Sequence, residues 1–291
     1  MRTPTRQRGV ALITAMLIVA LVGSVAINIA WENALDLRRT MTLLYRDQAV
    51  HVALGAENWV QQILRDDLAD SNTDHLGEIW ASDLPGLPVE SDVVQGELFG
   101  SIEDLQGRFN INNLVDQNGE VDQLSLEQFQ RLLIVLDLDP RFAGIAADWI
   151  DTNREPAFPD GAEDAIYTGL LPAYRAANVS LTNATELAAL EGMDPQTLEV
   201  LLPHVVALPG RTAINVNTAT PEVLQSLDEN LSSSDVEGLI SDRAEGGFAD
   251  VESTFSALVS PDVLPLLEES SSYFQLRVVV QIATVRIIYF S

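Results

Sequence analysis

The feature that most constrains this chain is an uncharged apolar run near its N-terminus. No charged residue occurs in residues 10–30, a length that matches the roughly 20 residues a helix needs to cross a bilayer core. Three arginines precede the run and carboxylates follow it, so the positive-inside rule predicts a cytoplasmic N-terminus and places everything after Trp31 outside. A secretory signal would end in a small-residue cleavage site after the apolar run. This run instead continues into a helical pattern, so we expect it to remain as an anchor.

A glycine separates the basic leader from the apolar run. The order of leader, Gly9 and apolar helix resembles a type IV pilin-like precursor, in which a membrane peptidase cuts after the glycine and the new N-terminus is methylated. The resemblance places the cut between Gly9 and Val10. Pilin-like proteins usually carry a glutamate five positions after the cut, where this chain has Thr14. A carboxylate inside the membrane costs about 3 kcal/mol unless it meets a countercharge. Thr14 therefore favours a subunit that caps a filament, although a plain anchor on an unrelated periplasmic protein predicts the same threonine.

The chain as a whole is strongly acidic. Its 16 basic and 43 acidic residues give a formal net charge of −27, and every basic residue is an arginine. Such a charge repels nucleic acid and anionic membrane surfaces and attracts divalent cations. There is no cysteine, so disulfides cannot stabilise the fold. Acidic solvation in a salt-rich habitat also explains the net charge.

The pattern of apolar residues predicts the order of elements. Helical spacing continues beyond the membrane over residues 31–68, and turn-forming residues then predict a loop over 70–92. Residues 95–112 have a strand-like pattern, residues 124–267 are mainly helical, and residues 273–290 alternate as a β-strand. Because the last strand has no neighbour close in sequence, its predicted partner is the 95–112 region. The helical middle is then an insertion between strands of one sheet, in an α+β fold.

Three motifs identify a family that the chain resembles. They are Phe-Asn-Ile-Asn-Asn-Leu at 109–114, Asp-Trp-Ile-Asp at 148–151 with Pro-Asp-Gly-Ala-Glu-Asp at 159–164, and Ile-Asn-Val-Asn-Thr-Ala at 214–219. A further segment, Pro-Ala-Tyr-Arg-Ala-Ala-Asn, follows at 172–178. Together with the pilin-type helix and the split sheet, these motifs resemble the type II secretion minor pseudopilin K family over nearly the whole chain.

The resemblance implies a fold and a set of domain boundaries. It implies a pilin-like long N-terminal helix packed on a small antiparallel sheet, with a large all-α domain, similar to SAM and helix-hairpin-helix modules, inserted between strands. The predicted parts are a leader (1–9), a transmembrane half (10–30) and a periplasmic half (31–68) of the helix, a pilin-like β core (69–112 and 268–291) and the inserted α-helical domain (113–267).

The resemblance also implies a function. Members of the family are minor pseudopilins that join minor pseudopilins I and J at the tip of the type II secretion pseudopilus, initiate its assembly and support export across the outer membrane. The implied further partners are minor pseudopilin H, major pseudopilin G and the prepilin peptidase. The implied location is the bacterial inner membrane, crossed once, with a periplasmic C-terminal domain.

The second motif predicts a metal site. Pro and Gly make its segment loop-like, and flexible acidic loops supply the six to eight oxygen ligands that calcium takes. The spacing is not that of an EF-hand, and a solvated acidic turn is the alternative on the residues alone. The resemblance implies calcium in the inserted domain, completed by backbone carbonyls near Asn178. The candidate ligands are Asp148, Asp151, Asp160, Glu163 and Asp164.

The sequence fits two other classes of function, a nucleic-acid-binding protein and an enzyme, less well. The third motif resembles the entry of a helix-hairpin-helix module, with Asn217 or Thr218 expected to cap the next helix, so a membrane-anchored protein of DNA uptake or binding is the alternative. The acidic charge argues against nucleic acid as a partner. An enzyme is not expected, because the chain has no cysteine and its three histidines lie in unrelated contexts without an H-E-x-x-H motif.

Overall fold

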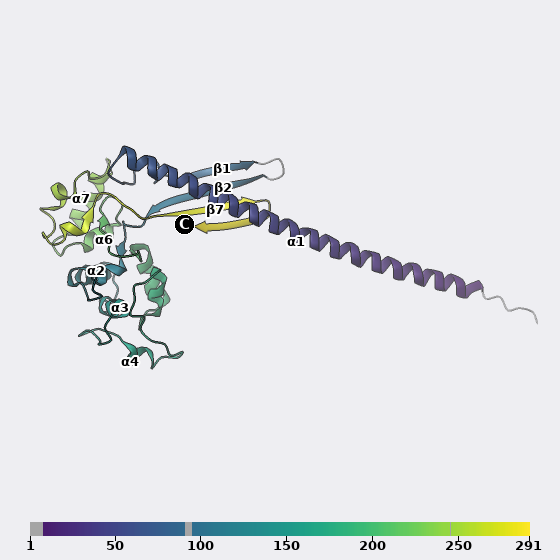
Figure 1. Cartoon of the computed structure of the whole chain (residues 1–291), viewed down its shortest axis with the longest axis horizontal. Helices are drawn as coiled ribbons and strands as arrows, with labels where there is room; N and C mark the ends of the chain where they lie inside the picture. Colours follow the sequence, from purple (N-terminus) through teal and green to yellow (C-terminus); the bar gives the residue numbers. More distant parts are fainter. Residues whose placement is uncertain (1–7, 91–94, 245) are drawn as a thin grey trace, which may run out of the picture. The chain divides into compact units, whose positions relative to one another are not determined.

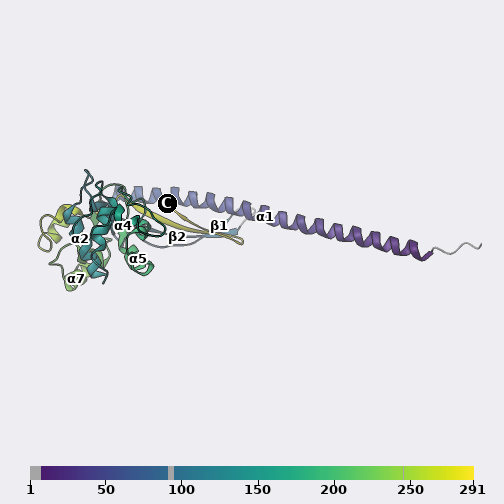
Figure 2. The ribbon, with the colours of Figure 1, turned by 90° about the horizontal axis from the view of Figure 1, so that it is seen from below.

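A single helix dominates the N-terminal part of the chain. The structure is a computed structural model that describes residues 8–90, 95–244 and 246–291, and in it helix α1 spans Arg8–Asp70 without a break (Figures 1 and 2). Within the described residues, α1 is the one helix long and apolar enough to cross a membrane, with a mean hydropathy of 2.7 in its most apolar window. Ala49, Ala53 and Ala56 are buried at a spacing of four and three residues, so one face of the outer half packs on protein. The prediction of a long N-terminal helix is confirmed.

Four strands form the sheet of the fold. They are β1 Leu84–Glu90, β2 Gln95–Asp104, β7 Phe274–Ile282 and β8 Val285–Phe290, in the order β1-β2-β7-β8 (Figure 1). The backbone N–H of Leu105 donates to the carbonyl of Tyr273 at the end of the antiparallel β2–β7 pair. The prediction that the helical middle is inserted between strands is confirmed. The single strand predicted over 273–290 is instead two strands: β7 pairs with β2, as predicted, whereas the last strand, β8, pairs with its sequence neighbour β7.

Strand β1 corrects one detail of the sequence-based prediction. It lies inside the 70–92 segment that was predicted to be a loop. Pro85 and Pro88 cause the error, because proline has no N–H for a sheet ladder and usually marks a turn. A strand at the edge of a sheet tolerates proline, since one of its sides pairs with no neighbour.

Short helices are the main regular elements of the inserted segment. The α-helices are α2 Gln123–Val135, α3 Phe142–Ile150, α4 Asp164–Tyr167, α5 Pro195–Leu201, α6 Pro221–Ser226, α7 Ser233–Arg243 and α8 Val251–Phe255. The 3-10 helices are η1 Ile111–Leu114, η2 Ala184–Ala189, η3 Leu202–His204 and η4 Leu264–Leu266. Side chains of Asp122, Asp194 and Ser232 accept backbone N–H groups at the starts of α2, α5 and α7, which is how these residue types begin helices. Their apolar faces share one core, in which the rings of Phe109 and Phe129 stack at 5.2 Å.

Two of the sequence motifs form the same structure twice. Strand β3 (Phe109–Asn110) pairs in parallel with β4 (Val205–Val206), and β5 (Ile214–Asn215) pairs in parallel with β6 (Leu267–Glu268). In each motif the second asparagine is buried, and its side chain binds backbone groups of a distant loop. These motifs therefore hold loops in place inside the inserted segment.

The amides of these two asparagines carry the contacts. The Nδ2 of Asn112 donates to the carbonyls of Leu181 (2.9 Å) and Leu208 (2.8 Å), and its Oδ1 accepts the N–H of Leu181. The Nδ2 of Asn217 donates to the carbonyl of Phe248, and the N–H of Phe248 donates to the Oδ1 of Asn217. The prediction that Asn217 caps the next helix is therefore wrong.

Thr220 caps α6 instead of Asn217 or Thr218. Its hydroxyl accepts the N–H of Val223 at 3.3 Å. Pro221 occupies the first turn, and because proline is favoured at the first helical position, the cap falls on the residue before it.

The described residues form two compact units. The first holds α1 up to Ala56 together with Pro85–Phe99 and Val278–Tyr289; the second holds Glu57–Leu84, Gly100–Arg277 and Phe290–Ser291. The domain boundaries given in the sequence analysis stay a prediction.

Candidate metal centre

The predicted acidic motif places three carboxylates in the protein interior. Asp148 lies in the last turn of α3, Asp151 follows directly after that helix, and Glu163 is the N-cap of α4. Their exposed fractions are 0%, 1% and 3%. Helix α3 is apolar over most of its length and is buried on nearly every side. Asp148 and Asp151 are buried because they lie in and next to this helix. No salt bridge reaches these three side chains from the described residues.

The loop between α3 and α4 folds back over Asp148. The carboxylate of Asp148 accepts the N–H of Ala157 at 3.0 Å. A Cβ atom at Gly161 would collide with Asp148 Oδ2 and with the backbone of Ala157, so this close approach requires glycine. The Oε1 atom of Glu163 accepts Nδ2 of Asn178 at 3.3 Å.

One carboxylate oxygen of Asp151 has no partner in the described part of the chain. The Oδ2 atom of Asp151 accepts Nδ2 of Asn153 at 2.6 Å, whereas its buried Oδ1 has no hydrogen bond from any described residue. Asn178 lies nearby in the left-handed region (φ 49°) and donates its N–H to the carbonyl of Trp149 and its Nδ2 to that of Asn153. A buried carboxylate oxygen without a donor is costly. A bound cation removes that cost.

The three buried carboxylates also repel one another. Burial, together with the negative charges of Asp148 and Glu163, raises the pKa of Asp151 to about 6. Burial likewise raises the pKa of Asp148 and that of Glu163. The motif therefore holds negative charge in the interior at neutral pH, and a cation would be attracted to it.

The other two predicted ligands have different neighbours. Asp164 accepts the N–H of Ala176 at 3.2 Å through Oδ1, and its Oδ2 lies 3.8 Å from Nη1 of Arg175. Asp160 is partly exposed and lies beside Gly144 of α3. Within the described residues, no three of the five predicted carboxylates have ligand oxygens that all lie within 4.8 Å of one another. Asp148, Asp151 and Glu163 thus lie close enough to repel one another, whereas Asp160 and Asp164 are only partly buried and have other neighbours.

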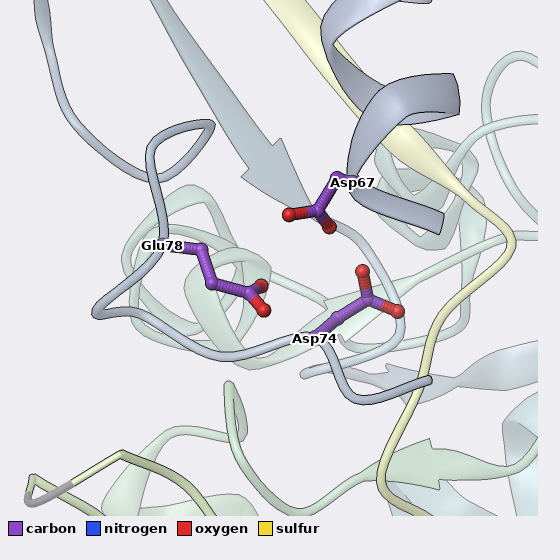
Figure 3. A group of neighbouring side chains, drawn as sticks. All are labelled: Asp67, Asp74 and Glu78. Carbon is purple, nitrogen blue, oxygen red and sulfur yellow. The ribbon is translucent and has the colours of Figure 1, made fainter. Parts of the chain in front are cut away.

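A different group of carboxylates does lie that close together, and the sequence analysis did not find it. Asp67 in the last turn of α1 and Asp74 and Glu78 in the following loop point toward one another (Figure 3). Protein donors already serve two of them, because Ser271 N donates to Asp74 at 2.7 Å and Trp80 Nε1 donates to Glu78 at 2.7 Å. No motif marks this group, since its members are ordinary acidic residues on both sides of a helix end.

The charge of this group gives it a pH dependence. Burial, together with repulsion from the carboxylates of Glu78, Asp104 and Asp67, raises the pKa of Asp74 to about 6 against the opposing effect of the Ser271 hydrogen bond. The folded state therefore holds the Asp74 proton more tightly than the unfolded chain, whose aspartate has a pKa near 3.8. The free energy of unfolding consequently rises as the pH falls from about 6 toward about 4, and this contribution is absent above 6.

Asp74→Asn is expected to remove this pH dependence. The variant should gain roughly 1 kcal/mol over the unsubstituted protein at pH 7.5, allowing for solvent screening of a half-buried group, and nothing at pH 4. Urea unfolding at both pH values measures the difference, with the exposed Asp83→Asn as the matched control. An equal effect of Asp74→Asn at the two pH values would contradict the assignment.

Comparisons with known proteins agree on one family. Two family models, both described as "Type II secretion system (T2SS), protein K", match residues 107–210 and 214–270. "Type II secretion system protein K" of Pseudomonas aeruginosa is 38% identical over 252 residues, covering 83% of this chain and 74% of the relative. The protein of the same description from Aeromonas hydrophila is 30% identical over 305 residues, covering 97% and 91%.

A solved structure has the same fold. A chain of the crystal structure of the GspK-GspI-GspJ complex from the enterotoxigenic Escherichia coli type 2 secretion system matches with a TM-score of 0.75 and 25% identity. The match covers 87% of this chain and 96% of that one. All of these relatives are described as parts of a type II secretion system.

Proposed function

Because the chain belongs to the family of type II secretion system protein K, we propose that it is the minor pseudopilin at the tip of a periplasmic pseudopilus. In this role it joins minor pseudopilins I and J, initiates assembly of major pseudopilin G with minor pseudopilin H below the tip, and supports protein export across the outer membrane. The observation that carries the proposal is the likeness, at a TM-score of 0.75, to a chain of a complex of proteins K, I and J. The protein acts as a structural subunit, without catalysis and without a nucleic-acid partner.

The hydrogen bonds of Thr14 support a position at the tip. Its hydroxyl donates to the backbone carbonyls of Ala11 (3.0 Å) and Val10 (3.1 Å) of its own helix. A threonine in this position is therefore satisfied within α1, whereas a carboxylate needs a countercharge from a neighbouring subunit. A subunit with nothing stacked above it has no such neighbour.

The anchor and its processing follow from the start of α1. We place the apolar half of this helix in the inner membrane, with the N-terminus in the cytoplasm and the remainder in the periplasm. The prepilin peptidase cuts between Gly9 and Val10, and the new terminus is methylated. Residues 1–7 of the leader lie outside the described residues, and α1 begins at Arg8.

Calcium is the ion that we propose for the acidic motif. Asp148, Asp151 and Glu163 are its inner ligands, which would give Asp151 Oδ1 the partner that it lacks. Asp160 and Asp164 complete the shell, with backbone carbonyls near Asn178, when the loop closes on the ion. All of these donors are hard oxygen atoms, the type that calcium prefers. The ion would then tie α3 to α4 in a chain that has no cysteine for disulfides.

The processing step offers a test in cells. In a strain that lacks its own protein K, this chain should restore abundant pseudopili when the major pseudopilin is overproduced. Gly9→Glu should restore none and should keep its leader in the mass spectrum, because the peptidase cuts after a glycine. Arg8→Lys, which keeps the charge beside the cut, is the matched control and should behave like the unsubstituted chain. A role in initiation would be contradicted if the strain formed abundant pseudopili with the unprocessed Gly9→Glu variant. Abundant pseudopili in the strain without any protein K would contradict it as well.

A further inference from the structure

The two edges of the four-stranded sheet are protected unequally. Exposed strand edges attract other strands, and proteins commonly block them with proline or charge. The edge strand β1 contains Pro85 and Pro88. The other edge strand, β8, reads Val-Arg-Ile-Ile-Tyr-Phe and contains no proline. Within the described residues, β7 is the only strand that pairs with β8.

The register of β8 leaves backbone groups pointing outward. Leu276 and Ser291 exchange both of their backbone hydrogen bonds, at 2.9 and 3.1 Å. Hydrogen-bonded and non-hydrogen-bonded pairs alternate along an antiparallel ladder. Counting back from this pair, Arg286 and Ile288 are in non-hydrogen-bonded positions. Their N–H and C=O groups therefore point away from β7, toward any strand that would add there.

The side chains at these positions form a mixed surface on the outer face of the sheet. The same register places Ile288 in one row with Val279 of β7 and Phe99 of β2, and Ile288 and Phe99 are 51% and 41% exposed. Arg286 is exposed and lies in the next row. The carboxylate of that row, Glu97, is two strands away, at roughly 10 Å by the usual strand spacing.

The charge of this edge differs from that of the rest of the protein. After Glu269 the given sequence has two arginines and no aspartate or glutamate, whereas its total charge is −27. A second copy, with the same −27, would be repelled as a whole. An extended segment with a carboxylate opposite Arg286 and an apolar side chain opposite Ile288 matches both the charge and the apolar row.

We propose that the outward edge of β8 is a docking edge for an extended acidic segment of a partner protein, which adds to the sheet as a further strand. Main-chain hydrogen bonds to residues 286 and 288 supply the pairing, and the side chains of Arg286 and Ile288 select the sequence. The proposal uses neither the acidic motif nor Thr14. Its test is therefore independent of the tip assignment.

Two labelled peptides test the edge on the full-length protein in detergent micelles. The first, Thr-Val-Thr-Glu-Thr, places valine opposite Ile288 and glutamate opposite Arg286 in antiparallel pairing; the second has lysine in place of glutamate. Fluorescence anisotropy should give about five-fold tighter binding of the glutamate peptide. Arg286→Glu should reverse this preference. Equal binding of the two peptides, or no binding of either, would overturn the proposal.

Backbone pairing is tested at position 288. Ile288→Pro removes an outward N–H but leaves the ladder with β7 intact, and it should weaken binding at least about five-fold. Ile288→Val keeps the N–H and is the matched control, expected to bind like the unsubstituted chain. If Ile288→Pro does not fold, the charge reversal at Arg286 decides the question. Unchanged binding by a folded Ile288→Pro variant would exclude strand addition.

Discussion

Removing calcium is expected to lower the melting temperature of the full-length protein by roughly 5–10 °C. An ion at a hundred times its dissociation constant stabilises the folded state by about 2.7 kcal/mol, and about 2–4 °C corresponds to each kcal/mol in a protein of this size. The physical reason is that Asp148, Asp151 and Glu163 are buried beside one another without a basic partner among the described residues. Calorimetry with calcium and with a chelator measures the shift.

Asp151→Asn is expected to change the melting temperature in opposite directions with and without calcium. Without calcium the variant is expected to melt higher than the unsubstituted protein, because it removes one charge from the repelling group. With calcium it is expected to melt lower, because it removes a ligand. The exposed Asp262→Asn is the matched control and should keep the full calcium response. Identical melting with calcium and with chelator would rule out a structural calcium site in this motif.

Asn112→Ala is expected to cost about 3–4 kcal/mol of unfolding free energy. The substitution removes three buried hydrogen bonds and leaves the backbone groups of Leu181 and Leu208 without partners. Each lost bond costs about 1 kcal/mol, and buried groups left unsatisfied add to this. Asn217→Ala should cost slightly less, since its main contacts are with one residue, Phe248.

Urea unfolding of the two asparagine variants provides the measurement. Asn118→Ala, in an exposed turn, is the matched control and should change the free energy by no more than about 0.5 kcal/mol. A loss below 1 kcal/mol for Asn112→Ala would mean that the motif does not hold these loops in place.

The parts of the fold that could be predicted from sequence are those set by periodic apolar patterns. The uncharged run and its helical continuation predicted α1, and alternation over 273–290 predicted β structure there, although as one strand and not as the two strands β7 and β8. Strand β1 was missed because Pro85 and Pro88 indicate a turn. Proline is compatible with an edge strand, but the sequence does not show that β1 lies at an edge.

The candidate site could be predicted only in part. Composition and turn residues located the acidic loop, but they do not tell which carboxylates are buried. Asp148 and Asp151 are buried because they end an apolar helix, whereas Asp160 and Asp164 stay partly exposed. The proximity of Asp67, Asp74 and Glu78 depends on how the chain turns after α1, and no local pattern encodes it.

The most direct test of the central claim is the mass of the assembly formed with proteins I and J. The three full-length proteins, co-produced in the membrane and purified in one detergent, should elute together, and light scattering should give one copy of each. This composition is what a tip subunit predicts. Elution of this chain alone, with circular dichroism that confirms its fold and with I and J present in excess, would contradict the tip assignment.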